Sequence, residues 1–382
     1  MRLEPVREAP PSTIGDALPA RPSPRLRRWG ENLFRWLFRM ALHLPEPWLE
    51  RLSETGSGPP VSRPGADPRA RFHAWLVTRF GAGSAGDPVS ARQPRLLSLG
   101  LLEGPARPLH EICDLSLPGT AGILRARLYV PYDTPAPAPA LIFLHFGGCV
   151  LGDLDTCHTA CTILARHGHF KVLSVEYRLA PEHKFPAAVE DTISAFRWLR
   201  LNAPLLGVDP GRIGIGGDSA GGYLAAAASL FLMDQAEPLP KLQLLMYPVL
   251  EMERLSLPAT EFDDCYPLTR RDMEWFAEQY MRSPQDASDP LCSVARAPRL
   301  AGMPPTLLVQ AGHDLLFDEG QRFAARLRAE GVPLLHRVYP TLPHAFSAMS
   351  GGLPAAHAAL VDIARAAGAA LATDAPPFKE TC

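Results

Sequence analysis

The sequence predicts an α/β protein whose mostly parallel central sheet is covered by helices on both faces. Two observations favour this class. Short, largely apolar runs alternate with helical stretches through the region 108–372, and such runs are typical of strands buried on both sides. A hairpin pattern at the start of this region makes the sheet mixed. Helical sequence before residue 108 predicts an additional N-terminal helical cap.

Length and composition are those of an ordinary globular protein. The chain has 382 residues, of which 47% are hydrophobic and 20% charged, so it can bury a full core. The 38 basic and 40 acidic residues give a formal charge of −2, which offers no overall field for nucleic acid. We therefore expect a small-molecule partner and no nucleic acid.

The N-terminal part divides into a leader, residues 1–24, and a helical cap region with its linker, residues 25–107. Prolines without periodicity predict that the leader is flexible. Apolar residues then recur at helical spacing until Pro45 and Pro47, and a second helix is predicted over 69–80. The first helix also has a basic flank. A cap helix, a membrane-surface contact through residues 25–44 and an oligomer contact are the open interpretations of this helix.

The region 108–372 is predicted to form the catalytic domain, followed by a tail at 373–382. Its hairpin strands flank a turn of sequence PGTAG at 118–122. The charged and aromatic segment 251–300 interrupts the alternation and is predicted to add to a lid. The expected strands are 110–117, 123–130, 140–146, 172–178, 213–218, 242–248, 306–311 and 334–339, and the expected helices are 157–168, 187–202, 219–233, 318–330 and 354–372.

The pentapeptide GDSAG at 217–221 carries the main chemical prediction. It lies between an expected strand and an expected helix, where small flanking residues allow the sharp turn of a nucleophile elbow. Ser219 is therefore the candidate nucleophile. A dinucleotide-binding loop is the rival interpretation of this glycine-rich turn, and it fails because position 219 holds serine where the third glycine belongs.

A serine nucleophile needs a base that is oriented by a carboxylate. Asp314 and His344 each follow an expected strand, in the chain order Ser, Asp, His that this kind of elbow requires. We prefer them over four competitors. Asp318 is expected to cap the next helix, Asp289 lies in the irregular insert, His313 adjoins Asp314 and His336 lies inside a strand.

The expected oxyanion donors are the backbone N–H groups of Gly147, Gly148 and Ala220. The two glycines follow an expected strand, and Ala220 follows the nucleophile. An ordinary glycine turn is the alternative for the first pair.

These blocks resemble the hormone-sensitive-lipase-like serine carboxylesterases of the GDSAG type. The resemblance covers roughly residues 108–372 and includes HFGG at 145–148 with GDLDT at 152–156, YRLAPEHKFPAA at 177–188, and the three triad segments. It implies the α/β-hydrolase fold with a helical cap, hydrolysis of short to medium acyl esters without a cofactor, and a homodimer. We expect Arg178 and Asp191 to fix the loop beside the site.

The glycine loop departs from the family pattern at two positions. Phe146 replaces the first glycine of the usual HGGG, and Cys149 follows the glycine pair. A β-carbon at position 146 is expected to shift the loop or narrow the pocket, because such a residue adopts positive φ only with difficulty. Phe146, Cys149 and Asp218 are the candidate pocket residues.

The cysteines and the lack of recognisable targeting sequences indicate where in the cell the protein is expected. The seven cysteines are odd in number and lack zinc or disulfide spacing, which favours a reducing compartment. Cys157 and Cys161 lie four apart, but one helix face and one loop do not supply a closed four-ligand site, so we expect no metal. No apolar run reaches about 18 residues and no secretion signal begins the chain, so a cytoplasmic location is expected.

The predicted function is a serine carboxylesterase acting through an acyl-enzyme intermediate. An amidase or peptidase with the same triad, and a non-catalytic ligand-binding protein on this scaffold, are the alternatives.

Overall fold

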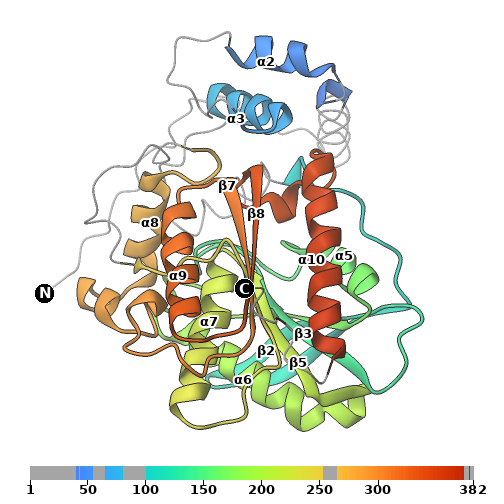
Figure 1. Ribbon diagram of the computed structural model, residues 1–382, viewed down its shortest axis with the longest axis vertical. Coiled ribbons are helices and arrows are strands. Elements are labelled where there is room, and N and C mark those ends of the chain that lie inside the picture. Colours follow the sequence, from blue (N-terminus) through green and yellow to red (C-terminus); the bar gives the residue numbers. More distant parts are fainter. Residues whose placement is uncertain are drawn as a thin grey trace, which may run out of the picture.

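The central element is one eight-stranded sheet, seen in a computed structural model of the chain (Figure 1). The structure describes residues 40–42, 44–54, 65–80, 100–252, 265–373 and 378. The strands lie in the order β1-β2-β4-β3-β5-β6-β7-β8. They are β1 (Glu111–Gly119), β2 (Gly122–Val130), β3 (Ala138–Leu144), β4 (Lys171–Glu176), β5 (Val208–Asp218), β6 (Gln243–Met246), β7 (Thr306–His313) and β8 (Leu334–Pro343).

The pairing confirms the predicted mixed sheet. β2 pairs antiparallel with both β1 and β4, whereas the six strands from β4 to β8 in the sheet order are parallel. The hairpin turn is tighter than the five residues expected, because Gly119 already pairs with Gly122. The carboxyl ends of the parallel strands therefore meet at one edge, where sites of such sheets form.

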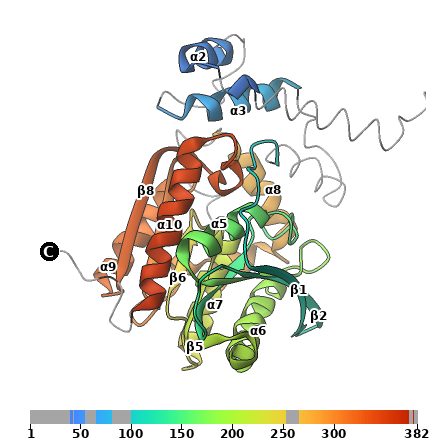
Figure 2. The same cartoon turned by 90° about the vertical axis from the view of Figure 1, so that its right-hand side faces the viewer.

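Helices cover both faces of the sheet (Figures 1 and 2). In β3, Ile142 and Leu144 belong to one buried cluster, and Leu141 and Phe143 belong to the other. Both faces of the strand are thus buried, which explains its unbroken apolar sequence. The first cluster includes side chains of α6 (Ala187–Asn202), α7 (Ala220–Asp234) and α9 (Phe317–Ala329), and the second those of α5 (His158–Gly168) and α10 (Pro354–Ala372).

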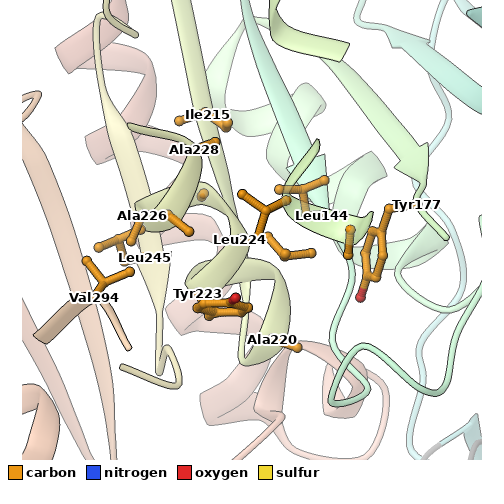
Figure 3. Packing of buried hydrophobic residues seen from close by; sticks show 14 of the residues in the cluster. Leu144, Tyr177, Ile215, Ala220, Tyr223, Leu224, Ala226, Ala228, Leu245 and Val294 are labelled. Atoms are coloured by element: carbon orange, nitrogen blue, oxygen red, sulfur yellow. The ribbon is translucent and has the colours of Figure 1, made fainter. Parts of the chain in front are cut away.

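Helix α7 lies very close to the sheet because its first turn has almost no side chains. A β-carbon on Gly221 would lie 1.8 Å from the carbonyl oxygen of Leu144, so only glycine fits there. Farther along, Leu224 and Ala226 lie among buried side chains of neighbouring strands (Figure 3). The sequence AGGYLAAAA therefore sets how closely the helix can approach β3 and β5.

Helix α10 corrects one expectation. It has 19 residues and is long and apolar enough, by length and composition alone, to cross a membrane. The expectation that no apolar run reaches about 18 residues is therefore wrong. The described helix packs against α5 and contributes nine buried residues to the core, which accounts for its apolar composition.

Two helices, α2 (Glu46–Glu54) and α3 (Pro68–Phe80), lie beyond the end of the sheet where β8 ends (Figures 1 and 2). The backbone N–H of Asp67 donates to Thr341 O at 2.9 Å, and Leu49 and Phe72 are buried in the second cluster. Helix α3 agrees with the predicted 69–80. Helix α2 was not predicted, because Pro47 was interpreted as a terminator although the first turn of a helix tolerates proline.

Other N-terminal predictions fall largely outside the described residues. Of the helix expected before Pro45, only residues 40–42 are described as helical. The leader 1–24 and most of the membrane-contact segment 25–44 lie outside the described part.

The residues from 265 to 300 contain α8 (Arg270–Tyr280) and two short 3-10 helices, η3 (Pro284–Ser288) and η4 (Val294–Arg296). Residues 253–264 lie outside the described part. Helix α8 begins with a capping box between Thr269 and Asp272. The Nζ of Lys184 donates to Glu278 O at 3.0 Å and to Met281 O at 2.8 Å, which ties this insert to the YRLAPEHKFPAA block.

Candidate active site

Ser219 occupies a sharp turn between the end of β5 and the start of α7. Its φ of 54° and ψ of −116° lie outside the regions that serine ordinarily adopts. The turn is held by the neighbouring strand, since the Ser219 N–H donates to Met246 O at 2.9 Å. A β-carbon on Gly217 would lie 2.3 Å from Leu144 O. The glycines of GDSAG therefore permit a conformation that larger residues would block.

His344 lies between Ser219 and Asp314. Its Nε2 is 2.9 Å from Ser219 Oγ, and its Nδ1 is 2.7 Å from Asp314 Oδ2. The other carboxylate oxygen of Asp314 accepts from the N–H of Leu316 at 2.9 Å. All three side chains of this Ser-His-Asp set are at most 6% exposed. The structure thus brings together three residues that are up to 125 positions apart in sequence.

The competing acids lie elsewhere. Asp318 was expected to cap α9, but the N-cap is Leu316 and Asp318 is in the first turn, so that expectation is wrong. The helix begins at Phe317, one residue earlier than predicted. Asp289 ends η3 and accepts from the N–H of Leu291 at 2.8 Å.

The competing histidines belong to β7 and β8. The Nε2 of His336 is 2.6 Å from Gln310 Oε1, and His336 lies inside β8 as expected. His313 is the last residue of β7, immediately before Asp314.

The glycine loop after β3 has three consecutive residues with positive φ. These are Gly147 at 124°, Gly148 at 64° and Cys149 at 60°. Phe146 does not have a positive φ, so the reason given for a shift of the loop at this position does not hold. The left-handed conformation begins one residue later, and the non-glycine residue that adopts it is Cys149. Narrowing of the pocket by Phe146 stays a prediction. Cys149 O accepts from the N–H of Ala180 at 2.8 Å, which helps to hold this turn.

Groups on both sides hold the glycine loop in place. A β-carbon on Gly148 would lie 2.2 Å from the ring of Phe276 in α8. The ring of His145 stacks on Tyr177 with centroids 4.3 Å apart, and the Tyr177 hydroxyl donates to His145 O at 2.8 Å. Burial lowers the pKa of His145 to about 4, so this histidine is neutral at physiological pH.

The three predicted oxyanion donors come from two different segments of the chain. Ala220 is the first residue of α7, where backbone N–H groups have no acceptor within the helix. Gly147 and Gly148 lie in the turn after β3, the strand that pairs with β5 beside the elbow. Their roles as donors remain predictions.

The three predicted pocket residues are all buried. Phe146 is 6% exposed, and Cys149 and Asp218 are 0% exposed. Phe146 belongs to the buried cluster that also contains Leu49 and Phe72 from the N-terminal helices. Their contact with a substrate remains a prediction.

Asp218 has partners that sequence reasoning missed. Its Oδ2 accepts from Ser347 Oγ at 2.5 Å and from Tyr247 Oη at 3.3 Å, and Cys157 Sγ lies 3.6 Å from Oδ1. Burial raises the pKa of Asp218 to about 6. Adjacency to the nucleophile was the one available signal, whereas nothing in the sequence near Ser347 or Tyr247 marks them.

Arg178 and Asp191 form the ion pair on which the expected loop support depends. The Nε of Arg178 lies 2.9 Å from Asp191 Oδ2, and the Arg178 N–H donates to the same oxygen at 2.9 Å. Asp191 is fully buried. The pair joins the segment after β4 to α6.

Comparison with known proteins gives one consistent family. Residues 141–348 match a family described by the alpha/beta hydrolase fold. The chain is 43% identical over 249 residues to the carboxylic ester hydrolase LipN of Mycobacterium tuberculosis, an alignment covering 63% of this chain and 66% of LipN, just under two thirds. It is 38% identical over 281 residues to the esterase LipI of the same organism, covering 72% and 86% of the two chains.

A solved structure agrees with these sequence matches. An alpha/beta hydrolase enzyme from the metagenome of Lake Arreo, Spain, superposes with a TM-score of 0.77 at 32% identity, covering 81% of this chain and 99% of the other. The sequence match spans more than half of the 382 residues, and the fold and the Ser-His-Asp set agree with it. The chain therefore belongs to the hormone-sensitive-lipase-like family of ester hydrolases with the α/β-hydrolase fold.

Proposed function

We propose that this protein is a serine carboxylesterase that hydrolyses short to medium acyl esters in two acyl-transfer steps. The observation that carries the proposal is the continuous contact from Ser219 Oγ through His344 to Asp314, with distances of 2.9 and 2.7 Å. The names of the relatives LipN and LipI support the reaction class.

In the first step, Ser219 Oγ attacks the ester carbonyl carbon while its proton moves to His344 Nε2. The carbonyl electron pair moves to the oxygen, which the N–H groups of Gly147, Gly148 and Ala220 stabilise. When this pair returns, the bond to the alcohol oxygen breaks. His344 gives its proton to that oxygen, so the alcohol leaves neutral and an acyl-serine remains.

In the second step, water takes the place of the alcohol. His344 Nε2 accepts a proton from the water, whose oxygen attacks the acyl carbon, and the same three N–H groups stabilise the new oxyanion. Collapse breaks the bond to Ser219 Oγ, which recovers the proton from His344. Asp314 stays ionised throughout and stabilises the imidazolium that forms twice in each turnover.

Replacing Ser219 by alanine tests this proposal. With p-nitrophenyl butyrate we expect kcat to fall by several orders of magnitude, on the order of 10⁵-fold or more. Ser229→Ala is the matched control, because Ser229 lies ten residues farther along α7 and donates only to Ala225 O. A phosphonate ester should add one adduct to the wild type and none to Ser219→Ala in intact-mass spectra. Near-normal hydrolysis by folded Ser219→Ala would overturn the proposal, and faster turnover of the matched anilide would favour an amidase.

We also propose a homodimer and a cytoplasmic location, with a membrane-surface contact of residues 25–44 as an alternative role for the N-terminal helix. The family resemblance supports the first, and the sequence supports the other two. Light scattering tests the homodimer, and cell fractionation tests the location. Vesicle co-sedimentation of the full chain and of a variant lacking residues 1–45 tests the membrane contact.

A further inference from the structure

A buried carboxylate beside the nucleophile connects three separate segments of the site. Asp218 directly precedes Ser219, and its side chain is fully buried. Ser347 Oγ donates to its Oδ2 at 2.5 Å, and Tyr247 Oη donates to the same oxygen at 3.3 Å. Cys157, the N-cap residue of α5, directs its thiol at the other oxygen from 3.6 Å.

Two of these partners, Ser347 and Tyr247, are also linked to His344, one through the chain and the other through a ring contact. Ser347 follows His344 by three residues, within η5 (Phe346–Met349). Tyr247 packs its ring edge-on against the His344 ring with centroids 5.0 Å apart, and its hydroxyl accepts from the N–H of Ser347 at 3.2 Å. Movement of Ser347 or Tyr247 would therefore change where His344 lies relative to Ser219.

The network depends on the ionised form of Asp218. An ionised carboxylate only accepts hydrogen bonds, which suits the hydroxyl, phenol and thiol donors around it. A protonated carboxyl would place a fourth hydrogen among three donors. Among the described residues, the titratable groups that interact electrostatically with Asp218 include His344, Cys157, Cys161, Tyr177 and Tyr247.

Most of these neighbours stay neutral. Burial holds the pKa of the Cys157 and Cys161 thiols and of the Tyr177 and Tyr247 phenols above their ordinary values, so these groups stay protonated. Two of them, Cys157 and Tyr247, donate to Asp218.

We propose that Asp218 is a positioning residue, which holds the loop carrying His344 against the nucleophile elbow through Ser347 and Tyr247. The inference rests on the proposed function, since it assigns how the base is kept in line with Ser219 Oγ. It differs from the role of Asp314, which orients the opposite ring nitrogen of His344.

The test compares four variants with the wild type on p-nitrophenyl butyrate, with folding checked by thermal unfolding. Asp218→Asn removes the charge, and we expect kcat to fall about 10- to 100-fold with KM within about twofold, because a small misplacement of a catalytic group has an effect of this size. Ser347→Ala should lower kcat in the same way, and Ser347→Thr should restore most of it. Tyr247→Phe keeps the ring beside His344 and should have a smaller effect.

The pH profile separates positioning from a general loss of structure. In the wild type, the acidic limb of kcat/KM should include a component near pH 6, where Asp218 becomes protonated. Asp218→Asn should lack this component. Ser347→Ala should move it to higher pH, because the carboxylate loses its closest donor.

The proposal would be overturned by an Asp218→Asn variant that folds and keeps the wild-type kcat together with the wild-type acidic limb of the kcat/KM profile. If that variant does not fold, Ser347→Ala decides, and a folded Ser347→Ala with wild-type kcat and acidic limb would be equally decisive against it. Ser219→Ala, measured in parallel, separates a failure of the proposed esterase function from a failure of the positioning proposal. Its activity tests the esterase mechanism itself, whereas the Asp218 and Ser347 variants test only how His344 is held.

Discussion

Tyr247 packs its ring against His344 at an interplanar angle of 61°, while Asp314 Oδ2 lies 2.7 Å from the Nδ1 of the same histidine. The imidazole is thus held by an inclined aromatic ring beside it and by a carboxylate at one end. Its Nε2 has Ser219 Oγ as partner at the other end. Orientation of this ring is the property on which the predicted chemistry depends most.

Asp314→Asn should lower kcat by about 10⁴-fold, because the amide no longer holds the histidine tautomer that accepts the serine proton. Asp318→Asn is the control, since Asp318 is exposed in the first turn of α9, and it should stay within about twofold of the wild type. Steady-state hydrolysis of p-nitrophenyl butyrate measures both. A small loss for Asp314→Asn would assign the carboxylate role to another residue.

Gly148→Ala should lower kcat by about 100-fold, because the new methyl group would meet the Phe276 ring at 2.2 Å and displace the N–H proposed as an oxyanion donor. The double variant Gly148→Ala, Phe276→Ala should recover part of this loss. Gly100→Ala is the control, as its β-carbon would have no neighbour within 4 Å. Wild-type kcat in the single variant would show that the loop tolerates the displacement.

Asp191→Ala should lower the free energy of unfolding by about 3 kcal/mol, because it leaves Arg178 without its buried partner. Glu190→Ala removes another carboxylate that binds the same arginine. Its side chain is 46% exposed, so the loss should stay below about 1 kcal/mol. Urea unfolding measures the difference, and equal losses would contradict the view that burial decides the strength of these two pairs.

Asp218 should make the folded state less stable as pH rises. The pKa of Asp218 is about 6 in the folded protein and 3.8 in the unfolded chain. Between these pH values the folded protein therefore binds more protons than the unfolded chain. The stability contribution is present below pH 3.8 and is lost by pH 6, by roughly 3 kcal/mol. Asp218→Asn should lack this decline. Parallel stability curves for the two proteins from pH 4 to pH 7 would refute the assignment.

His145 should act in the opposite direction. Burial lowers its pKa from 6.5 to about 4, so the unfolded chain binds more protons in this interval. Its contribution is full above pH 6.5 and is lost as pH falls to 4, by roughly 3 kcal/mol. His145→Asn should remove this acid sensitivity while retaining a polar group toward Phe146 O. The measurement is the pH dependence of unfolding, and an unchanged acidic slope would count against it.

Local sequence patterns predicted most of the fold and the candidate catalytic residues. Apolar runs of strand length, separated by helical periods, predicted all eight strands, because burial on both faces requires this composition. The GDSAG turn and the residues after β7 and β8 pointed to Ser219, Asp314 and His344, since parallel strands bring their carboxyl ends to one edge. These inferences need only the neighbours of each residue in the chain.

Tertiary structure alone decided how those residues are supported. Asp218 and Ser347 are 129 positions apart, and their contact depends on the packing of β5 beside β6 and on the turn after His344. The positive φ of Cys149 in the glycine loop likewise depends on how the loop meets Ala180 and Phe276. A sequence pattern records the local period and turn chemistry, whereas the partner of a buried polar group is set by whichever distant segment packs against it.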